Sequence, residues 1–160
     1  MTINEKIKPG DIILYGGSRH ESLASRLVEA GEIIKTGDDS IRQYSHVALW
    51  EGHQVQLEAT WPRIRRSRID QGRTYDVLRY EGITDDERNK IMDAARARIG
   101  EWYNLLYIPT FGLWKIKNME VCCTYAGDCY EAAGLELNYA TPNELKDDRC
   151  LKTIYRWRPR

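Results

Sequence analysis

The amino-acid sequence predicts an α+β domain, because strand patterns dominate the first half of the chain and helical patterns the second. The clearest strand pair lies over 44–50 and 54–60, and the clearest helices lie over 84–99 and 121–134. Clustered strands followed by helices are typical of α+β domains, whereas parallel α/β folds alternate the two. A length of 160 residues suits one domain, which we place over 1–160.

The predicted elements follow in chain order from local patterns. A turn at 9–11 leads into an apolar strand over 12–15. A helix over 22–30 and a loop at 37–40 precede the hairpin strands. The later elements are a strand over 75–80, the helix over 84–99, an ambiguous aromatic-rich stretch over 104–114, the cysteine helix, a short helix from 141 and a final strand over 152–157.

Two threonines mark predicted helix starts. Thr84 precedes three acidic residues, which favour a helix N-terminus, and Gly100 closes that helix. Thr141 is followed by Pro142 at the first helical position and by Glu144 three residues after the cap. These signals predict where the helices of the second half begin.

Charge and hydropathy limit the classes of function. Twenty-four basic residues balance 24 acidic ones, so we expect no nucleic-acid partner, since such proteins usually carry a basic excess. No apolar stretch approaches the roughly 18 residues that indicate a transmembrane helix. Residues 1–10 are polar and lack the apolar core of a signal peptide. We therefore expect a cytoplasmic protein, with a phage-encoded or signal-independently exported protein as the alternative.

Three of the four cysteines crowd one predicted helix. They are Cys122, Cys123 and Cys129, and Cys150 lies further along the chain. The set lacks the paired C-x-x-C spacing of zinc sites, so we expect no metal and no cofactor. We expect no structural disulfide in a reducing compartment. Cys129 lies about two helical turns after Cys122 and is interpreted as a small buried apolar residue.

A cysteine at a helix start and a histidine remote in sequence indicate thiol acyl-transfer chemistry. Cys122 lies at the first turn, where free N–H groups and the helix dipole lower the pKa of a thiol. His46 lies within the strand pattern 44–50. Taken alone, each residue also fits a structural role: Cys122 as a packed thiol and His46 as a hydrogen-bonded histidine. A third group beside them is therefore needed before catalysis is the favoured interpretation.

The predicted hairpin supplies that third group. A three-residue loop at 51–53 places His46 directly opposite Glu58. Residues directly opposite on antiparallel strands share a face, with Cβ atoms about 4.5–5.5 Å apart. A carboxylate there fixes the imidazole tautomer and leaves the other ring nitrogen to take a proton. His20 and His53 are weaker candidates for the base.

Six segments of the chain together match a known pattern. They are Lys8–Leu14, Tyr44–Leu49, Val55–Ala59, Gly100–Asn104, Cys122–Gly134 and Thr141–Leu145. In this order they resemble the circularly permuted branch of the NlpC-type papain-like superfamily, most closely the YiiX/YaeF-like proteins. The resemblance spans nearly the whole chain. It implies a circularly permuted papain-like fold, in which an antiparallel sheet packs against a helix that carries the cysteine at its N-terminus.

The resemblance also implies roles for individual residues. It makes Cys122 the nucleophile, His46 the base and Glu58 the residue that orients the base. Cys123 stands where the family usually has serine, which leaves either thiol open as the nucleophile, with Cys122 favoured. The implied activity is hydrolysis of an amide, such as a cell-wall stem peptide, through a thiol acyl-enzyme. The alternatives are a lipid thioesterase or acyltransferase of the lecithin:retinol-acyltransferase-like type, and a non-catalytic binding domain.

Two further sets of residues are candidates for substrate contact. The backbone N–H of Cys122, with a hydroxyl from Tyr103 or Tyr15, is a candidate oxyanion hole. Four arginines follow the hairpin, namely Arg63, Arg65, Arg66 and Arg68. They form either a solvated surface run or a site for carboxylate or phosphate, which arginine binds in bidentate fashion. The expected partner is a small peptide, a peptidoglycan fragment or an acyl substrate.

Overall fold

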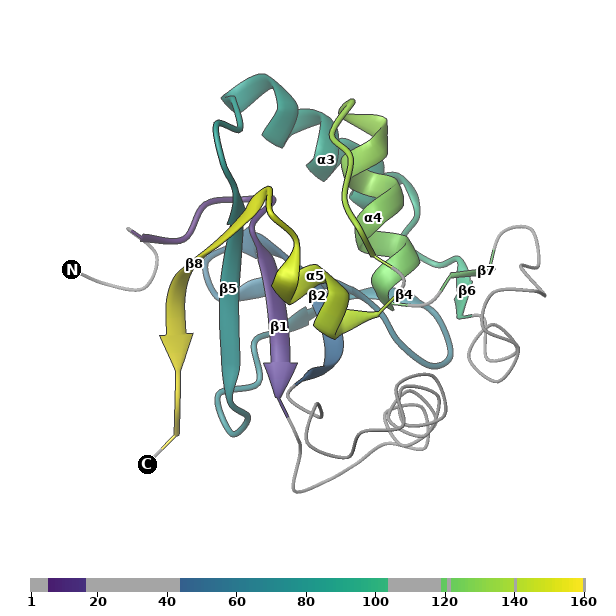
Figure 1. The fold of residues 1–160 in the computed structure, drawn as a ribbon. Coiled ribbons are helices and arrows are strands. Elements are labelled where there is room, and N and C mark those ends of the chain that lie inside the picture. Colours follow the sequence, from purple (N-terminus) through teal and green to yellow (C-terminus); the bar gives the residue numbers. More distant parts are fainter. Residues whose placement is uncertain (1–5, 17–43, 104–118, 121, 140, 160) are drawn as a thin grey trace.

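The computed structural model of the chain describes residues 6–16, 44–103, 119–120, 122–139 and 141–159. These residues confirm the predicted α+β class (Figure 1). Their main sheet is antiparallel and has the strand order β4-β3-β2-β1-β5-β8. Its strands are β1 (Ile12–Gly16), β2 (Tyr44–Gly52), β3 (Val55–Ala59), β4 (Ile64–Arg68), β5 (Tyr75–Tyr80) and β8 (Leu151–Trp157).

Several predicted features lie outside the described residues. They are the helix over 22–30, the loop at 37–40, the aromatic-rich stretch over 104–114 and the base candidate His20.

The described helices are α3 (Asp85–Ala97), α4 (Cys122–Ala132) and α5 (Pro142–Asp147). Two of these three helices, α3 and α5, begin directly after the threonines that the capping signals identify. At α3, the Thr84 hydroxyl accepts a hydrogen bond from the Glu87 N–H, and the Glu87 carboxylate accepts one from the Thr84 N–H. At α5, the Thr141 hydroxyl accepts from the Glu144 N–H. None of the described helices is long and apolar enough to cross a membrane.

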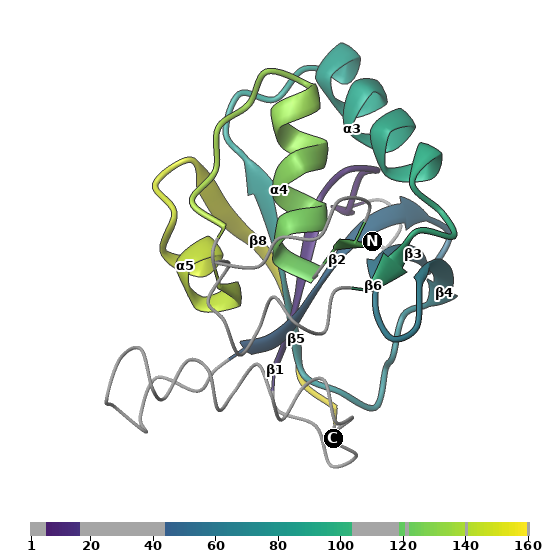
Figure 2. The same cartoon turned by 90° about the vertical axis from the view of Figure 1, so that its right-hand side faces the viewer.

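Helices α3 and α4 lie side by side over one face of the sheet (Figures 1 and 2). The core between the two layers includes Leu14, Leu49, Ile91 and Tyr125, all fully buried. Burying one such aliphatic side chain contributes about 1.5–3 kcal/mol to stability. The Tyr125 hydroxyl donates to the carbonyl of Ala95 at 3.0 Å, which joins α4 to α3. The helix that begins at Cys122 is therefore held firmly on the sheet.

A second cluster of buried side chains lies on the opposite face of the sheet. It includes Ile13, Tyr15, Trp50, Tyr75 and Val77. These residues alternate with those of the first core along each strand, because successive side chains point to opposite faces. The central strands β1, β2 and β5 are thus buried on both faces.

The β2–β3 hairpin differs from the predicted register by two residues. Its loop is the pair 53–54, and both residues have positive φ angles, 50° and 62°. Positive φ at both loop residues is typical of the two-residue hairpin turn whose twist matches the strands. Leu49 consequently pairs with Leu57, and His46 lies diagonal to Glu58 instead of directly opposite. A shift of two residues keeps both side chains on one face, because the side-chain period is also two.

Two short strands that the sequence analysis does not predict lie next to the start of α4. They are β6 (Trp102–Tyr103) and β7 (Met119–Glu120), which pair in parallel. The Tyr103 N–H donates to the carbonyl of Pro62 at 2.9 Å, and Trp102 forms a bridge with Arg63. These contacts connect the segment before α4 to the segment that enters β4.

Candidate active site

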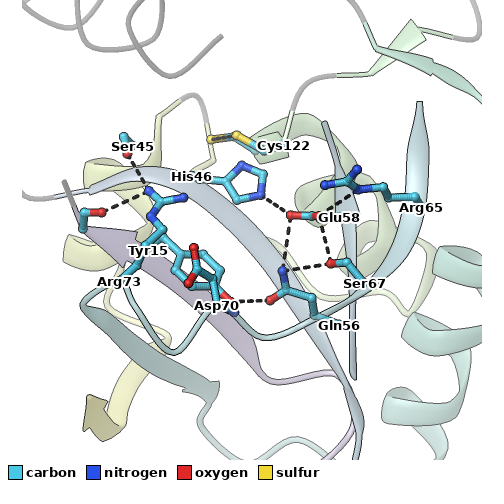
Figure 3. Close-up of polar contacts among 12 residues, drawn as sticks. Tyr15, Ser45, His46, Gln56, Glu58, Arg65, Ser67, Asp70, Arg73 and Cys122 are labelled. Atoms are coloured by element: carbon cyan, nitrogen blue, oxygen red, sulfur yellow. Dashed lines mark hydrogen bonds and ion pairs between the residues drawn. The ribbon is translucent and has the colours of Figure 1, made fainter. Parts of the chain in front are cut away.

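Cys122 and His46 meet at one end of the sheet (Figure 3). Helix α4 begins at Cys122 and packs over β2 and β3, the strands that carry His46 and Glu58. His46 pairs with Tyr15 near the end of β1, where the β1–β2 register becomes irregular. The start of the helix is therefore next to the strand that carries the imidazole.

Glu58 and His46 form a short hydrogen bond. The Nε2 atom of His46 lies 2.7 Å from the Oε2 atom of Glu58. The two side chains are only 14% and 8% exposed, so little solvent screens their interaction. With Nε2 bound to the carboxylate, Nδ1 is the ring nitrogen left for the thiol. The Tyr15 ring stacks on the imidazole, with centroids 5.9 Å apart, and limits its rotation.

The surroundings of Cys122 favour the thiolate. The hydrogen bond with the Cys123 thiol, whose sulfur lies 3.9 Å away, is the largest influence and lowers the pKa of Cys122. Burial raises that pKa, and hydrogen bonds with His46 and the Val47 backbone lower it again, to well below its usual range. Burial lowers the pKa of His46, but the hydrogen bonds with Cys122 and Glu58 raise it to about 9. Both shifts favour the thiolate–imidazolium form of the pair.

Glu58 is held as a carboxylate by donors at both of its oxygens. Ser67 Oγ donates to Oε1 at 2.8 Å and Arg65 Nε to Oε1 at 3.1 Å. Gln56 Nε2 donates to Oε2 at 3.3 Å. Burial raises the pKa of Glu58, but the hydrogen bonds from His46, Ser67 and Arg65 lower it to about 2. The charge beside the imidazole is therefore permanent at any physiological pH.

Gln56 and Ser67 are site residues that the sequence analysis does not identify. Gln56 is buried, donates to Ser67 Oγ at 3.2 Å and accepts from the Tyr15 hydroxyl at 2.6 Å. The alternation along β3, which places Gln56 on the face of Glu58, is the signal that points to it. Because the Tyr15 hydroxyl donates to Gln56 and accepts from the Asp70 N–H, it is engaged within the sheet. Its geometry favours positioning of the site over oxyanion binding.

Tyr103 lies close to the two thiols. Burial raises its pKa well above the usual value, and the charges of Cys122 and Cys123 raise it further. Its hydroxyl therefore keeps its proton at neutral pH. Of the two tyrosines that the sequence analysis considers, Tyr103 is the one whose pKa responds to the charges of the two thiols.

Two of the predicted substrate-binding arginines lie on the side of the site. Arg65 contacts Glu58 through its Nε and is otherwise largely exposed. The Arg63 guanidinium lies over the ring of Trp102, 4.3 Å from the ring centroid. Trp102 directly precedes Tyr103 in the sequence. Arg65 thus contacts the candidate site directly, and Arg63 contacts a residue beside it.

The other two arginines have different surroundings. Arg66 Nη2 donates to Glu51 Oε1 at 2.7 Å, and Arg96 of α3 shares the same carboxylate. Arg68 is exposed at the end of β4. The four arginines thus do not form one continuous binding surface among the described residues.

No cluster of three or more His, Cys, Asp or Glu side chains in the described part of the chain is arranged to hold a metal ion. His46 and Glu58 are hydrogen-bonded to each other, and the carboxylate is further occupied by Ser67 and Arg65. The donor atoms near Cys122 therefore do not fit a metal centre.

Comparison with known proteins supports the fold. No protein-family model and no curated protein matches the sequence. The antiparallel sheet with its covering helices belongs to the YiiX-like fold class. A solved example is metalloprotein YiiX from Escherichia coli O157:H7, with a TM-score of 0.69 and 18% sequence identity over 96% of this chain and 99% of that chain. At this identity the similarity establishes the fold, and it confirms the YiiX-like resemblance found in the sequence.

Proposed function

We propose that the chain is a cysteine-dependent hydrolase that cleaves amides on a circularly permuted papain-like fold. The observation that carries the proposal is the chain of contacts Glu58–His46–Cys122, with 2.7 Å between carboxylate and imidazole. The position of Cys122 at the start of α4 supports it. A thiolate beside an imidazolium that a carboxylate orients is the arrangement that thiol acyl transfer requires.

The chemistry follows from the charges of the pair. The Cys122 thiolate attacks the substrate carbonyl carbon and forms a carbon–sulfur bond. The His46 imidazolium, poised at Nδ1, then gives its proton to the leaving amine as the carbon–nitrogen bond breaks. Neutral His46 next takes a proton from water, which attacks the acyl-enzyme and releases the acid. Glu58 keeps the imidazole in one orientation during both steps and stabilises its charged form.

The negative oxygen that develops on the carbonyl needs hydrogen-bond donors. The backbone N–H of Cys122, at the first residue of α4, has no partner within the helix and is the first donor that we propose. The Tyr103 hydroxyl is the second, because it stays protonated beside the thiols. Removing a single oxyanion donor typically lowers the turnover rate by about 100- to 1,000-fold.

The substrate that we propose is a small peptide or peptidoglycan fragment with a negative charge. Arg63 and Arg65 lie on the side of the site and support recognition of a carboxylate. YiiX is named a metalloprotein, but the described residues of this chain do not provide a metal-binding donor set. No step of the proposed mechanism therefore passes through a metal.

Trapping of the acyl-enzyme tests the proposal. The protein is mixed with a panel of short peptide amides and acyl thioesters, quenched in acid and measured by intact mass. We expect an acyl adduct on Cys122 with at least one amide, no adduct in Cys122→Ala and no turnover in His46→Ala. Cys150→Ala is the matched control, because Cys150 lies outside the site and its loss should leave turnover unchanged.

The remaining outcomes separate the alternatives. Adducts with thioesters alone would indicate the thioesterase or acyltransferase activity. A folded protein that forms no adduct with either class would indicate a binding domain.

For an anionic amide that is turned over, Arg63→Gln should raise KM more than it lowers kcat, because it removes binding shared by ground and transition states. Arg68→Gln, a neutralised arginine away from the site, should change neither.

A further inference from the structure

Two adjacent thiols lie at the candidate site, and the proposed hydrolysis uses one of them. The sulfur atoms of Cys122 and Cys123 are 3.9 Å apart, and both residues are almost fully buried, at 2% and 3% exposed. The second sulfur thus lies next to the sulfur of Cys122, whose surroundings favour the thiolate, the form that reacts with oxidants. This arrangement has a chemical consequence of its own, independent of any substrate.

We propose that Cys122 and Cys123 form a peroxide-sensitive dithiol, which closes reversibly to a vicinal disulfide. In the first step the Cys122 sulfur attacks a peroxide oxygen, the oxygen–oxygen bond breaks, and a sulfenic acid forms. In the second step the Cys123 sulfur displaces the hydroxyl group, and a sulfur–sulfur bond forms as water leaves. Overall, two thiols are oxidised by two electrons, and one hydrogen peroxide is reduced to two waters.

The other cysteines are poorly placed for the second step. Cys129 lies seven residues after Cys122 on the same helix, a rise of about 10 Å. Cys150 interacts with Tyr80, at the far end of β5 from Tyr75 and the site. Cys123 is therefore the thiol that can intercept a sulfenic acid on Cys122 before a second peroxide does.

Local backbone geometry makes the proposed disulfide labile. Adjacent Cα atoms are about 3.8 Å apart across a trans peptide, which is shorter than the roughly 4.4–6.8 Å usual for disulfides. A strained disulfide is more easily reduced than a relaxed one. Both residues lie in the first turn of α4, so the strain of the disulfide falls at the end of the helix.

Formation of the disulfide requires only the two thiols and an oxidant. Its effect on turnover rests on the proposed hydrolase function. Oxidation would remove the thiolate and so switch the enzyme off until a reductant restores it. It would also protect Cys122 from further oxidation to sulfinic and sulfonic acids, which thiols do not reverse.

Mass spectrometry after peroxide treatment tests the proposal without any need for activity. The folded protein is exposed to a few equivalents of hydrogen peroxide, denatured, alkylated and digested. In the wild type we expect the peptide that contains Cys122 to carry an alkyl group on Cys129 only and to be lighter by two hydrogen atoms at 122–123. Treatment with dithiothreitol should restore both thiols.

Cys123→Ser is the decisive variant, because serine is nearly isosteric but cannot form the disulfide. We expect it to lose the lighter species and to accumulate added oxygen on Cys122 at least about tenfold faster than the wild type. The proposal is overturned if wild type and Cys123→Ser gain oxygen on Cys122 at the same rate, or if Cys122 links to Cys129 or Cys150 instead. Should Cys123→Ser fail to fold, the position of the disulfide in wild-type fragment spectra decides the matter.

Discussion

Glu58→Gln removes the negative charge beside His46 while keeping the size of the side chain. In the wild type, burial lowers the pKa of His46, but Cys122 and Glu58 together raise it from 6.5 to about 9. That difference corresponds to about 3 kcal/mol in favour of the imidazolium. An opposite charge at this distance typically contributes about 1–3 pKa units. We therefore expect Glu58→Gln to lower the pKa of His46 by about 1–2 units.

An NMR titration of the histidine rings measures this shift directly. The protein contains three histidines, so His20 and His53 serve as internal references. Glu51→Gln is the matched control, because Glu51 is a carboxylate of the same hairpin that arginines, not His46, engage. Its removal should leave the pKa of His46 unchanged. The reasoning is refuted if His46 titrates at the same pH in Glu58→Gln and in the wild type, or if both variants shift it equally.

Three further predictions concern the stability of the fold, measured by urea unfolding. Tyr15→Phe leaves the buried Gln56 oxygen without its donor, so we expect a loss of about 1–3 kcal/mol. Asp11→Asn removes the buried charge that Arg88 contacts at 3.0 Å, so we expect a loss of about 3–5 kcal/mol. Burial raises the pKa of Glu58, but its partners lower it from 4.5 to about 2; it therefore stabilises the protein above pH 4.5, and this stabilisation is lost as the pH falls towards 2.

Each of these predictions has an outcome that contradicts it. An unfolding free energy of Tyr15→Phe equal to that of the wild type would show that the hydroxyl is not needed inside the sheet. If Asp11→Asn lowers the unfolding free energy no more than Asp86→Asn does, the charge of Asp11 is not important for stability. Asp86→Asn removes a carboxylate from an exposed pair with Lys90. Equal losses of unfolding free energy in the wild type and in Glu58→Gln between pH 5 and pH 2 would show that the ionised Glu58 carboxylate does not stabilise the fold.

The sequence was informative where a local rule applies. Thr84 and Thr141 predict the starts of α3 and α5 because a capping hydroxyl acts within one helical turn. The contact between His46 and Glu58 follows from strand alternation, which tolerates an error of two residues in register. These features depend on spacing along the chain.

The remaining features depend on contacts that spacing does not encode. The two-residue turn at 53–54 contains no glycine, so no residue type in the sequence indicates its positive φ angles. Gly52, just before the turn, instead favours a longer loop. Strands β6 and β7 are two residues long, which is too short for any periodic pattern. The hydrogen bonds that Ser67 and Arg65 donate to Glu58 require β4 to pair with β3 in one particular register. Only the folded sheet defines that register.

The central claim is that Cys122 is a thiolate at neutral pH because of His46 and Cys123. The most direct test is the rate of iodoacetamide alkylation of each cysteine between pH 4 and pH 10, mapped by mass spectrometry. We predict that Cys122 reacts fastest at pH 6, at a rate close to its rate at pH 8, and that His46→Ala moves the midpoint of its alkylation profile towards about 8.5. A wild-type midpoint for Cys122 near 8.5, or faster reaction of Cys123 or Cys150 at pH 6, would contradict it.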